Sequence, residues 1–196
     1  FGIVRYDKYN EAQSLGIFLV SSKLMGAATS EAERVQYAFK DDEAPNPSSR
    51  YTNYSASGYL WYYYNKNWQL DSTKYWENYY YDQGISRELF WYGNGQIIDS
   101  AGGGLFVIKF RHSQDPSKVV YAVWKDSSST GKGIPVNLPA GMVSNAQKMV
   151  GSFKKLTPTY SKVIVKNGRI QTIATTLHQF FFVTEGAGSN RSRLRE

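Results

Sequence analysis

The sequence predicts a mixed fold in which a helix–strand–helix segment precedes an all-β antiparallel sandwich. Three observations predict it: apolar residues recur at helical spacing early in the chain, aromatic residues crowd the middle, and short alternating runs follow Ser86. With 41% hydrophobic residues in 196, the chain has enough apolar side chains to bury a core. We therefore expect two regions of different architecture.

The first expected element is a helix from Glu11 to Ala28. Asn10 stands where an N-cap side chain accepts a backbone N–H. The apolar residues of the helix recur at helical spacing and are Leu15, Phe18, Leu19 and Met25. The next segment, Glu33–Lys40, alternates large apolar with polar residues and runs into the polar stretch DDEAPNPSS. A strand that ends in a polar loop should therefore follow the helix.

Aromatic residues mark the middle of the chain, because Tyr51 to Tyr92 holds 11 of the 16 tyrosines and four of the five tryptophans. Within it, DSTKYWENYYYDQG predicts a second helix, capped by Asp71 and stopped by Gly84. In the stretch YLWYYYNKNW, three adjacent tyrosines cannot all face one core. This stretch either packs at the seam between the two regions, which we favour, or binds sugar.

After Ser86 the chain reads as short strands with turn residues between them, which is typical of a sandwich. Asn167-Gly168 predicts a two-residue hairpin, and we expect Trp91 and Trp124 in the sandwich core. The last residues lack periodicity. The expected division is therefore 1–86 for the helix–strand–helix region, 87–186 for the sandwich and 187–196 for a flexible tail or linker.

Composition limits the chemistry that this chain offers. It has no cysteine and two distant histidines, so we expect neither a metal nor another cofactor and assign His112 and His178 no chemistry. No apolar run approaches the roughly 20 residues of a membrane span. Residues 1–100 hold 9 Lys/Arg against 12 Asp/Glu, and residues 101–196 hold 14 against 4. Because the lysines of the basic half are spread singly along strands, we do not expect nucleic acid as a partner.

The order of these elements resembles the C-terminal part of TIM-barrel glycoside hydrolase-like proteins of the retaining, two-glutamate type, such as those of Bacteroidetes-like polysaccharide degraders. FGIVRYD is similar to the end of barrel strand seven, EAQSLGIFLVSSKLMGAA to helix seven, ERVQYAFKDD to strand eight and KYWENYYY to helix eight. FVIKF, KVVYAVWKD and FFFVTEG are similar to the appended sandwich. The resemblance implies the C-terminal remnant of a (β/α)8 barrel followed by the sandwich.

The resemblance also implies an activity that this chain does not carry alone. Retaining glycosidases use two carboxyl groups roughly 5–5.5 Å apart, which in a barrel project from the C-terminal ends of strands. The nucleophile would be a glutamate immediately before Phe1, and the acid/base would lie on an earlier strand. The implied partners are a poly- or oligosaccharide and the N-terminal barrel portion, in the same or a separate chain. The implied location is secreted or at the cell surface.

Candidate sugar-binding residues follow from the same resemblance, because substrate lies over the C-terminal strand ends of a barrel. Asp7 either accepts a hydrogen bond from a sugar hydroxyl or is a solvated loop or near-cap residue. Phe39 either stacks on a pyranose or belongs to the barrel core. The acidic residues after Phe39 either contact sugar or form a solvated turn. We expect sugar contact here and not in the sandwich. The candidates are Tyr6, Asp7, Phe39, Lys40, Asp41, Asp42, Tyr51 and Tyr54.

A second interpretation remains open. The chain could be a non-catalytic carbohydrate-binding or structural module of a surface, filament or virion, since neither of the implied catalytic glutamates lies within it and its sandwich is basic.

Overall fold

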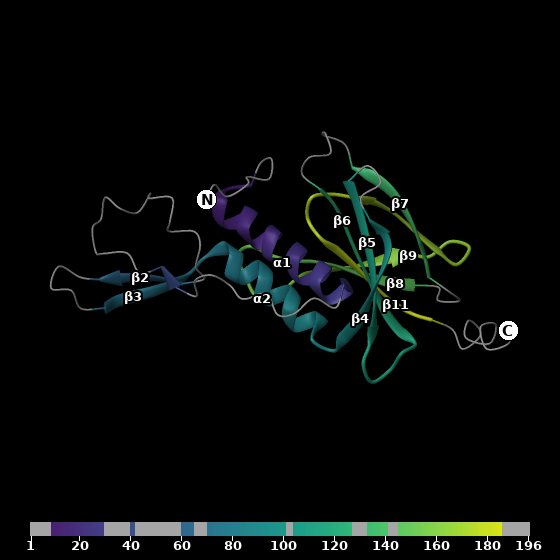
Figure 1. The fold of residues 1–196 in the computed structure, drawn as a ribbon, viewed down its shortest axis with the longest axis horizontal. Helices are drawn as coiled ribbons and strands as arrows, with labels where there is room; N and C mark the ends of the chain where they lie inside the picture. Colours follow the sequence, from purple (N-terminus) through teal and green to yellow (C-terminus); the bar gives the residue numbers. More distant parts are fainter. Residues whose placement is uncertain are drawn as a thin grey trace.

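The computed structural model contains two helices followed by antiparallel β-sheets, which confirms the predicted fold class (Figure 1). It describes residues 9–29, 40–41, 60–64, 70–100, 104–126, 133–140 and 145–185. No helix within these ranges is long and apolar enough to cross a membrane.

Helix α1 spans Glu11–Thr29 and begins as the sequence predicts. The backbone N–H of Gln13 donates to Asn10 Oδ1 at 2.9 Å, and the backbone N–H of Asn10 donates to Gln13 Oε1 at 3.3 Å. This reciprocal pair is a capping box, which satisfies two backbone donors at the start of the helix. The predicted N-cap is therefore confirmed.

The second helix begins later than predicted. Residues Leu70–Tyr75 form strand β3, and α2 spans Glu77–Leu89. Asp71 is therefore not a cap; Trp76 occupies that position in an extended conformation with no side-chain cap hydrogen bond. Gly84 is not a stop either. It lies buried inside α2, where a Cβ would come within 2.8 Å of the carbonyl oxygen of Leu156, so this glycine permits close packing.

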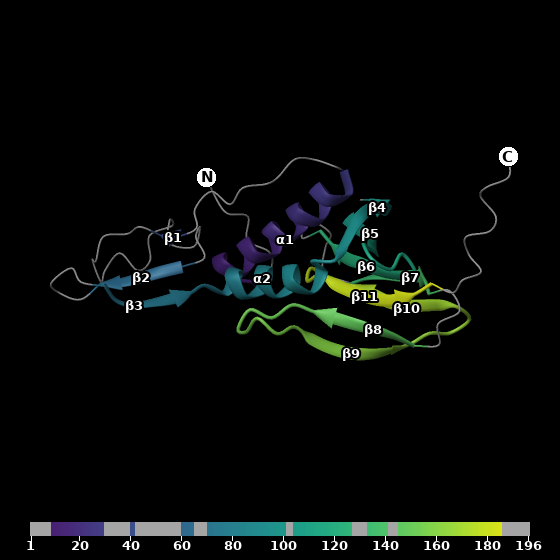
Figure 2. The same cartoon turned by 90° about the horizontal axis from the view of Figure 1, so that it is seen from below.

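Strand β3 forms a small sheet with two other segments. Strand β2, Leu60–Tyr64, pairs antiparallel with β3, and β1, Lys40–Asp41, pairs parallel with the start of β2. The hairpin of β2 and β3 extends from the start of α2 away from the other sheets (Figures 1 and 2). The side chains of YLWYYYNKNW lie outside the described residues, so the expectation that this stretch packs at the seam between the two regions stays a prediction.

The sandwich has one sheet of six strands and one of two, all pairs being antiparallel. The six-stranded sheet has the order β4-β5-β6-β11-β8-β9, and the second sheet pairs β7 with β10. The strands are β4 Tyr92–Ser100, β5 Leu105–His112, β6 Lys118–Lys125, β7 Ile134–Pro139, β8 Asn145–Val150, β9 Thr159–Ile164, β10 Arg169–Ala174 and β11 Gln179–Thr184.

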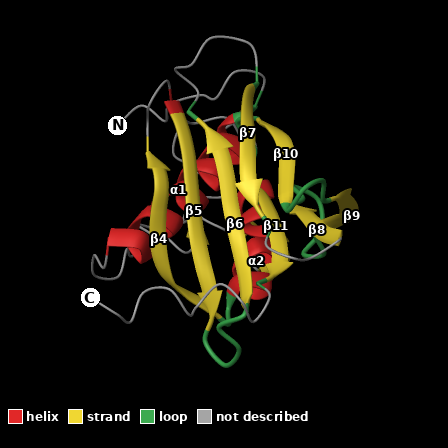
Figure 3. Ribbon diagram, turned by 90° about the vertical axis from the view of Figure 1, so that its right-hand side faces the viewer, coloured by secondary structure: helices red, strands yellow, loops and turns green. Residues whose placement is uncertain are grey.

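Two cores lie on opposite faces of the six-stranded sheet. On one face α1 and α2 pack on the strands (Figure 3), with Ile17 and Tyr81 against Phe180 in one cluster. On the other face β7 and β10 cover the sheet, with Leu138 in a cluster that includes Phe181. Because strand side chains alternate between faces, neighbouring phenylalanines of β11 enter different cores. The helices and the sandwich therefore share a hydrophobic core.

The two tryptophans predicted in the sandwich core have different outcomes. Trp124 is 3% exposed and is buried as predicted, although it lies in the core between the sheet and the helices and not in the core between the two sheets. Trp91 is 50% exposed, so its assignment to the core is wrong: it lies in the turn between α2 and β4 and its ring meets Phe90 edge to face. The expected boundary at residue 86 lies within α2, and the division into parts that fold independently stays a prediction.

Candidate functional site

Most of the sugar-binding residues expected from the sequence lie outside the described residues. Lys40 and Asp41 are described through their backbone, as strand β1, whose partners are Leu60 and Trp61. The sugar-binding role of the whole set stays a prediction. The residues outside the described ranges are Tyr6, Asp7, Phe39, Asp42, Tyr51 and Tyr54.

A serine, a histidine and a tyrosine meet between the helices and the sheet. Ser21 Oγ lies 2.9 Å from His178 Nε2, and the Tyr81 hydroxyl lies 3.0 Å from His178 Nδ1. The same hydroxyl accepts the backbone N–H of His178 at 3.2 Å. Burial lowers the pKa of His178 to about 3 and raises the pKa of Tyr81. Both groups are therefore neutral at ordinary pH.

Both ring nitrogens of His178 are occupied, Nδ1 by the Tyr81 hydroxyl and Nε2 by Ser21. The tautomer of the ring sets which partner donates in each of these two hydrogen bonds. Because burial lowers its pKa to about 3, His178 is a weak base toward the Ser21 hydroxyl. The cluster links α1 and α2 to the chain entering β11.

A buried carboxylate joins the two helices. Lys23 Nζ lies 2.6 Å from both carboxylate oxygens of Asp82, whose side chain is fully buried. Ser86 Oγ donates to the same carboxylate at 3.3 Å. Since the lysine approaches from α1 and the carboxylate belongs to α2, this pair is a structural contact between the helices. Within the described ranges, no group of three or more acidic or histidine side chains could hold a metal ion.

An open groove lies at the far edge of the sandwich, between β9 and β10. The two strands leave a tight turn at Asn167-Gly168, whose φ values are 51° and 68°, as a two-residue hairpin requires. Only Lys166 and Arg169 bridge, with backbone hydrogen bonds of 3.0 and 2.9 Å. Beyond them β9 pairs with β8 and β10 pairs with β7. The hairpin predicted at Asn167-Gly168 is confirmed, but its strands diverge into different sheets.

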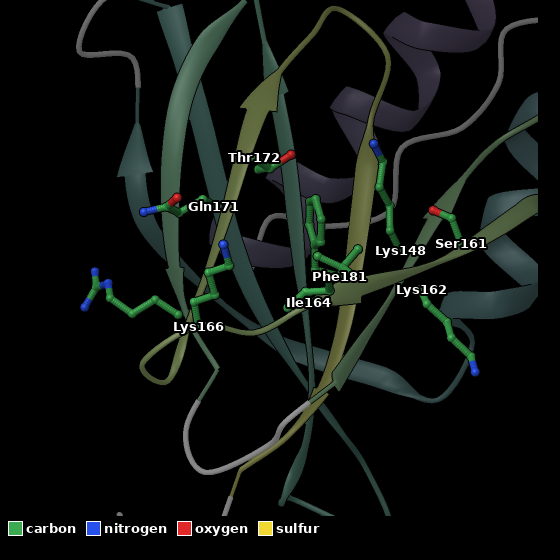
Figure 4. A pocket seen from close by; sticks show the side chains of 10 residues that line it. Lys148, Ser161, Lys162, Ile164, Lys166, Gln171, Thr172 and Phe181 are labelled. Carbon is green, nitrogen blue, oxygen red and sulfur yellow. The ribbon is translucent and has the colours of Figure 1, made fainter.

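Cationic side chains surround this groove, which we call the β9–β10 groove and which has a volume of about 500 Å³. Lys148 and Lys166 stand on either side of the Phe181 ring, and the amine of Lys162 turns outward (Figure 4). Lys148 Nζ lies 6.0 Å from the centre of that ring. Arg169 contributes the fourth cation and is held by Asn137, to whose Oδ1 its Nε donates at 2.8 Å. Among the residues that the structure describes, no acidic side chain lines the groove.

Sequence reasoning missed the groove. The sequence predicts sugar contact outside the sandwich, because the sandwich strands show no polar and aromatic cluster, and the lysines of these strands are isolated along the sequence. The pairing of β8 with β9 puts Lys148 opposite Ser161, and the turn returns the chain so that Arg169 faces Lys166. Only Asn167-Gly168 signals this arrangement in the sequence, and it does not show that the strands diverge.

No family model matches the chain, and no curated protein matches it. Three solved structures resemble it in part. The glycoside hydrolase family 30 endoxylanase of Clostridium papyrosolvens C71 has 13% identity, with 56% of this chain and 28% of that chain covered and a TM-score of 0.37. The family 30 subfamily 8 xylanase of Clostridium acetobutylicum has 16% identity, with 92% of this chain and 41% of that chain covered and a TM-score of 0.44.

The third structure is the catalytic domain of family 30 xylanase C from Talaromyces cellulolyticus. It has 10% identity, with 95% of this chain and 39% of that chain covered and a TM-score of 0.46. The chain is thus similar in part to family 30 xylanases. It spans less than half the length of each of these three structures.

Proposed function

We propose that this chain is the C-terminal part of a glycoside hydrolase-like protein that acts on a polysaccharide. In this proposal α1 and α2 are the last two helices of a (β/α)8 barrel, and the sandwich packs on their outer side. Both catalytic glutamates belong to the portion before Phe1, so the chain does not hydrolyse a glycoside alone. Secretion or display at the cell surface follows for a protein with such a substrate.

The apolar character of both sides of α1 carries the proposal. Ile17 and Leu24 are buried against the sheet. At 100° per residue, Leu15, Phe18 and Leu19 project from the opposite side of the helix, where Phe18 is 51% exposed. A helix that covers a single core has a polar second face. A barrel helix with an appended domain has two apolar neighbours, the barrel strands within and the domain without.

Charge in α1 supports the same assignment. Its 19 residues include two charged ones, Glu11 at the start and Lys23, which pairs with Asp82 of α2. After the first turn, the side with Phe18 therefore carries no charged residue. Under the proposal, substrate lies at the barrel rim near Tyr6, Asp7 and the Phe39–Asp42 segment, with Tyr51 and Tyr54 beyond it.

One observation favours the alternative, a non-catalytic carbohydrate-binding module. Phe90 and Trp91 are 73% and 50% exposed in one turn, and an exposed aromatic face suits the apolar face of a pyranose. In that case the binding energy comes from this turn, and no glutamate pair is needed.

Release of reducing ends from a panel of neutral and acidic polysaccharides separates the two functions. We expect no release by residues 1–196 and release by a longer protein that includes the segment before Phe1. Saccharide binding without hydrolysis by the longer protein, lost in Trp91→Ala, would overturn the enzymatic proposal in favour of the binding module. Asp41→Ala and Tyr54→Ala should weaken oligosaccharide binding by the longer protein if the rim assignment is correct.

A further inference from the structure

We propose that the β9–β10 groove binds an anionic polysaccharide, one that carries carboxylate or sulfate groups along a hydroxyl-bearing chain. The inference rests on the proposed function in one respect, the choice of a saccharide as the polymer. The groove lies in the sandwich and is separate from the barrel rim where the resemblance puts the substrate.

The shape of the groove comes from the diverging hairpin. Strand β9 is an edge strand of the six-stranded sheet and β10 is paired with β7, so the two walls belong to different sheets. They meet only at the Lys166–Arg169 bridge. The Gly168 carbonyl accepts the backbone N–H of Ala140 at 2.8 Å, which ties the turn to the end of β7. A groove fixed at its closed end by these bonds is formed before any ligand arrives.

The charge of the groove indicates an anionic ligand. Lys162, Lys166 and Arg169 are exposed and Lys148 is half-buried. Among the described side chains, none of the four cations is within ion-pair distance of a carboxylate, whereas elsewhere in the sandwich Lys109 and Arg111 share Glu185. Like charges held together repel one another. An anion between Lys148 and Lys166 would relieve that repulsion and accept charge-assisted hydrogen bonds.

The polar residues of the groove favour a saccharide. Ser161 and Gln171 are exposed on opposite walls, one on β9 and the other on β10, and both donate and accept hydrogen bonds. A chain of sugar hydroxyls presents the same two functions. Single-stranded nucleic acid binds instead by stacking its bases on accessible aromatic rings. The aromatic ring in this groove, Phe181, is fully buried at its base.

Calorimetric titration of residues 1–196 with three oligosaccharides tests the inference. The probes are oligogalacturonate for carboxylate, a heparin oligosaccharide for sulfate and cellohexaose as a neutral control. We expect at least one anionic probe to bind, cellohexaose not to bind at the groove, and the affinity to fall when NaCl is raised from roughly 50 to roughly 500 mM, because salt screens exposed charges. The two anionic arms identify the group that the groove prefers.

Matched variants assign the binding to the groove. Lys148→Gln with Lys166→Gln should lower the affinity for the anionic probe about tenfold or more, since two charge-assisted contacts are lost. The control, Lys154→Gln with Lys155→Gln, removes the same charge from the exposed turn between β8 and β9 and should leave the affinity unchanged. Lys148→Arg with Lys166→Arg should retain binding. Thermal unfolding of each variant checks that the groove still folds.

Three results would overturn the inference: no binding of either anionic probe, equal weakening in the groove and control variants, or tighter binding of a single-stranded DNA oligonucleotide than of either saccharide. Hydrolysis of polysaccharide by the longer protein does not depend on these lysines. Failure of the groove and failure of the proposed function are therefore distinguishable.

Discussion

Polar side chains are paired with one another on the helix-covered face of the six-stranded sheet, whereas the cationic side chains at its open β8–β9 edge have no acidic partner among the described residues. Under the helices, Asp82 is paired with Lys23, and His178 is bonded to both Ser21 and Tyr81. At the open edge, four cations surround a groove that no acidic side chain of the described part of the chain lines. Polar groups on the helix side therefore hold elements together, whereas those at the edge are available to a ligand. Mutations in the two regions should differ accordingly.

The largest effect is expected for Tyr81→Phe. The change removes the hydroxyl that bonds the ring and the backbone N–H of His178, and it leaves both groups buried without that partner. Each unsatisfied buried group costs roughly 1–3 kcal/mol, so the free energy of unfolding should fall by about 3 kcal/mol. Urea denaturation measures this. Tyr80→Phe, at a half-exposed neighbour, is the control and should change stability by under about 0.5 kcal/mol.

A smaller effect is expected from pH. The pKa of His178 is lowered by burial to about 3 in the folded protein, whereas an unfolded histidine titrates near its ordinary value of about 6.5. As pH falls below that value, the unfolded chain binds a proton that the folded chain does not, and stability falls by up to about 1.4 kcal/mol per unit. Between about pH 7 and about pH 5 the loss should be about 2 kcal/mol.

Urea midpoints measured across that pH range test the assignment. His178→Gln should lower stability near neutral pH and flatten its dependence on pH over this range. An unchanged slope in the variant would mean that another group causes the dependence and would contradict the neutral, buried state of His178.

The smallest effect on stability is expected at the groove. Lys148→Gln with Lys166→Gln removes two charges that make no ion pair within the described ranges. The free energy of unfolding, measured by thermal unfolding, should therefore change by under about 0.5 kcal/mol. Stability and ligand affinity should therefore separate at this edge. A loss of several kcal/mol would show that these lysines are structural, as the polar groups under the helices are.

Local signals predicted part of the fold. Asn10 predicted the start of α1 through its capping chemistry, and Asn167-Gly168 predicted a turn with two positive φ values. The alternating runs after Ser86 predicted the antiparallel strands. In these cases the residues that specify the structure are neighbours in the sequence.

Other features depend on residues that are distant in the sequence. The sequence predicts a helix stop at Gly84, whereas the contact that requires a glycine there, the Leu156 carbonyl oxygen, is 72 positions away. His178 meets Ser21 across 157 positions, so no spacing could reveal the pair. The groove was missed for the same reason, since strand pairing brings together lysines that are isolated in the sequence. Trp91 was assigned to the core from its aromatic character, although a turn leaves it exposed.

The accessibility of Phe18 tests the proposed barrel most directly. The chain has no cysteine, so Phe18→Cys provides a unique thiol on the side of α1 that faces away from the sandwich, and Ser113→Cys, in the exposed turn between β5 and β6, provides a control. In residues 1–196 both thiols should react readily with a maleimide. In the longer protein, with any other cysteines replaced, the thiol at position 18 should react at least about tenfold more slowly, because barrel strands cover it, while the control is unchanged. Equal reactivity at position 18 in both proteins would contradict the barrel assignment.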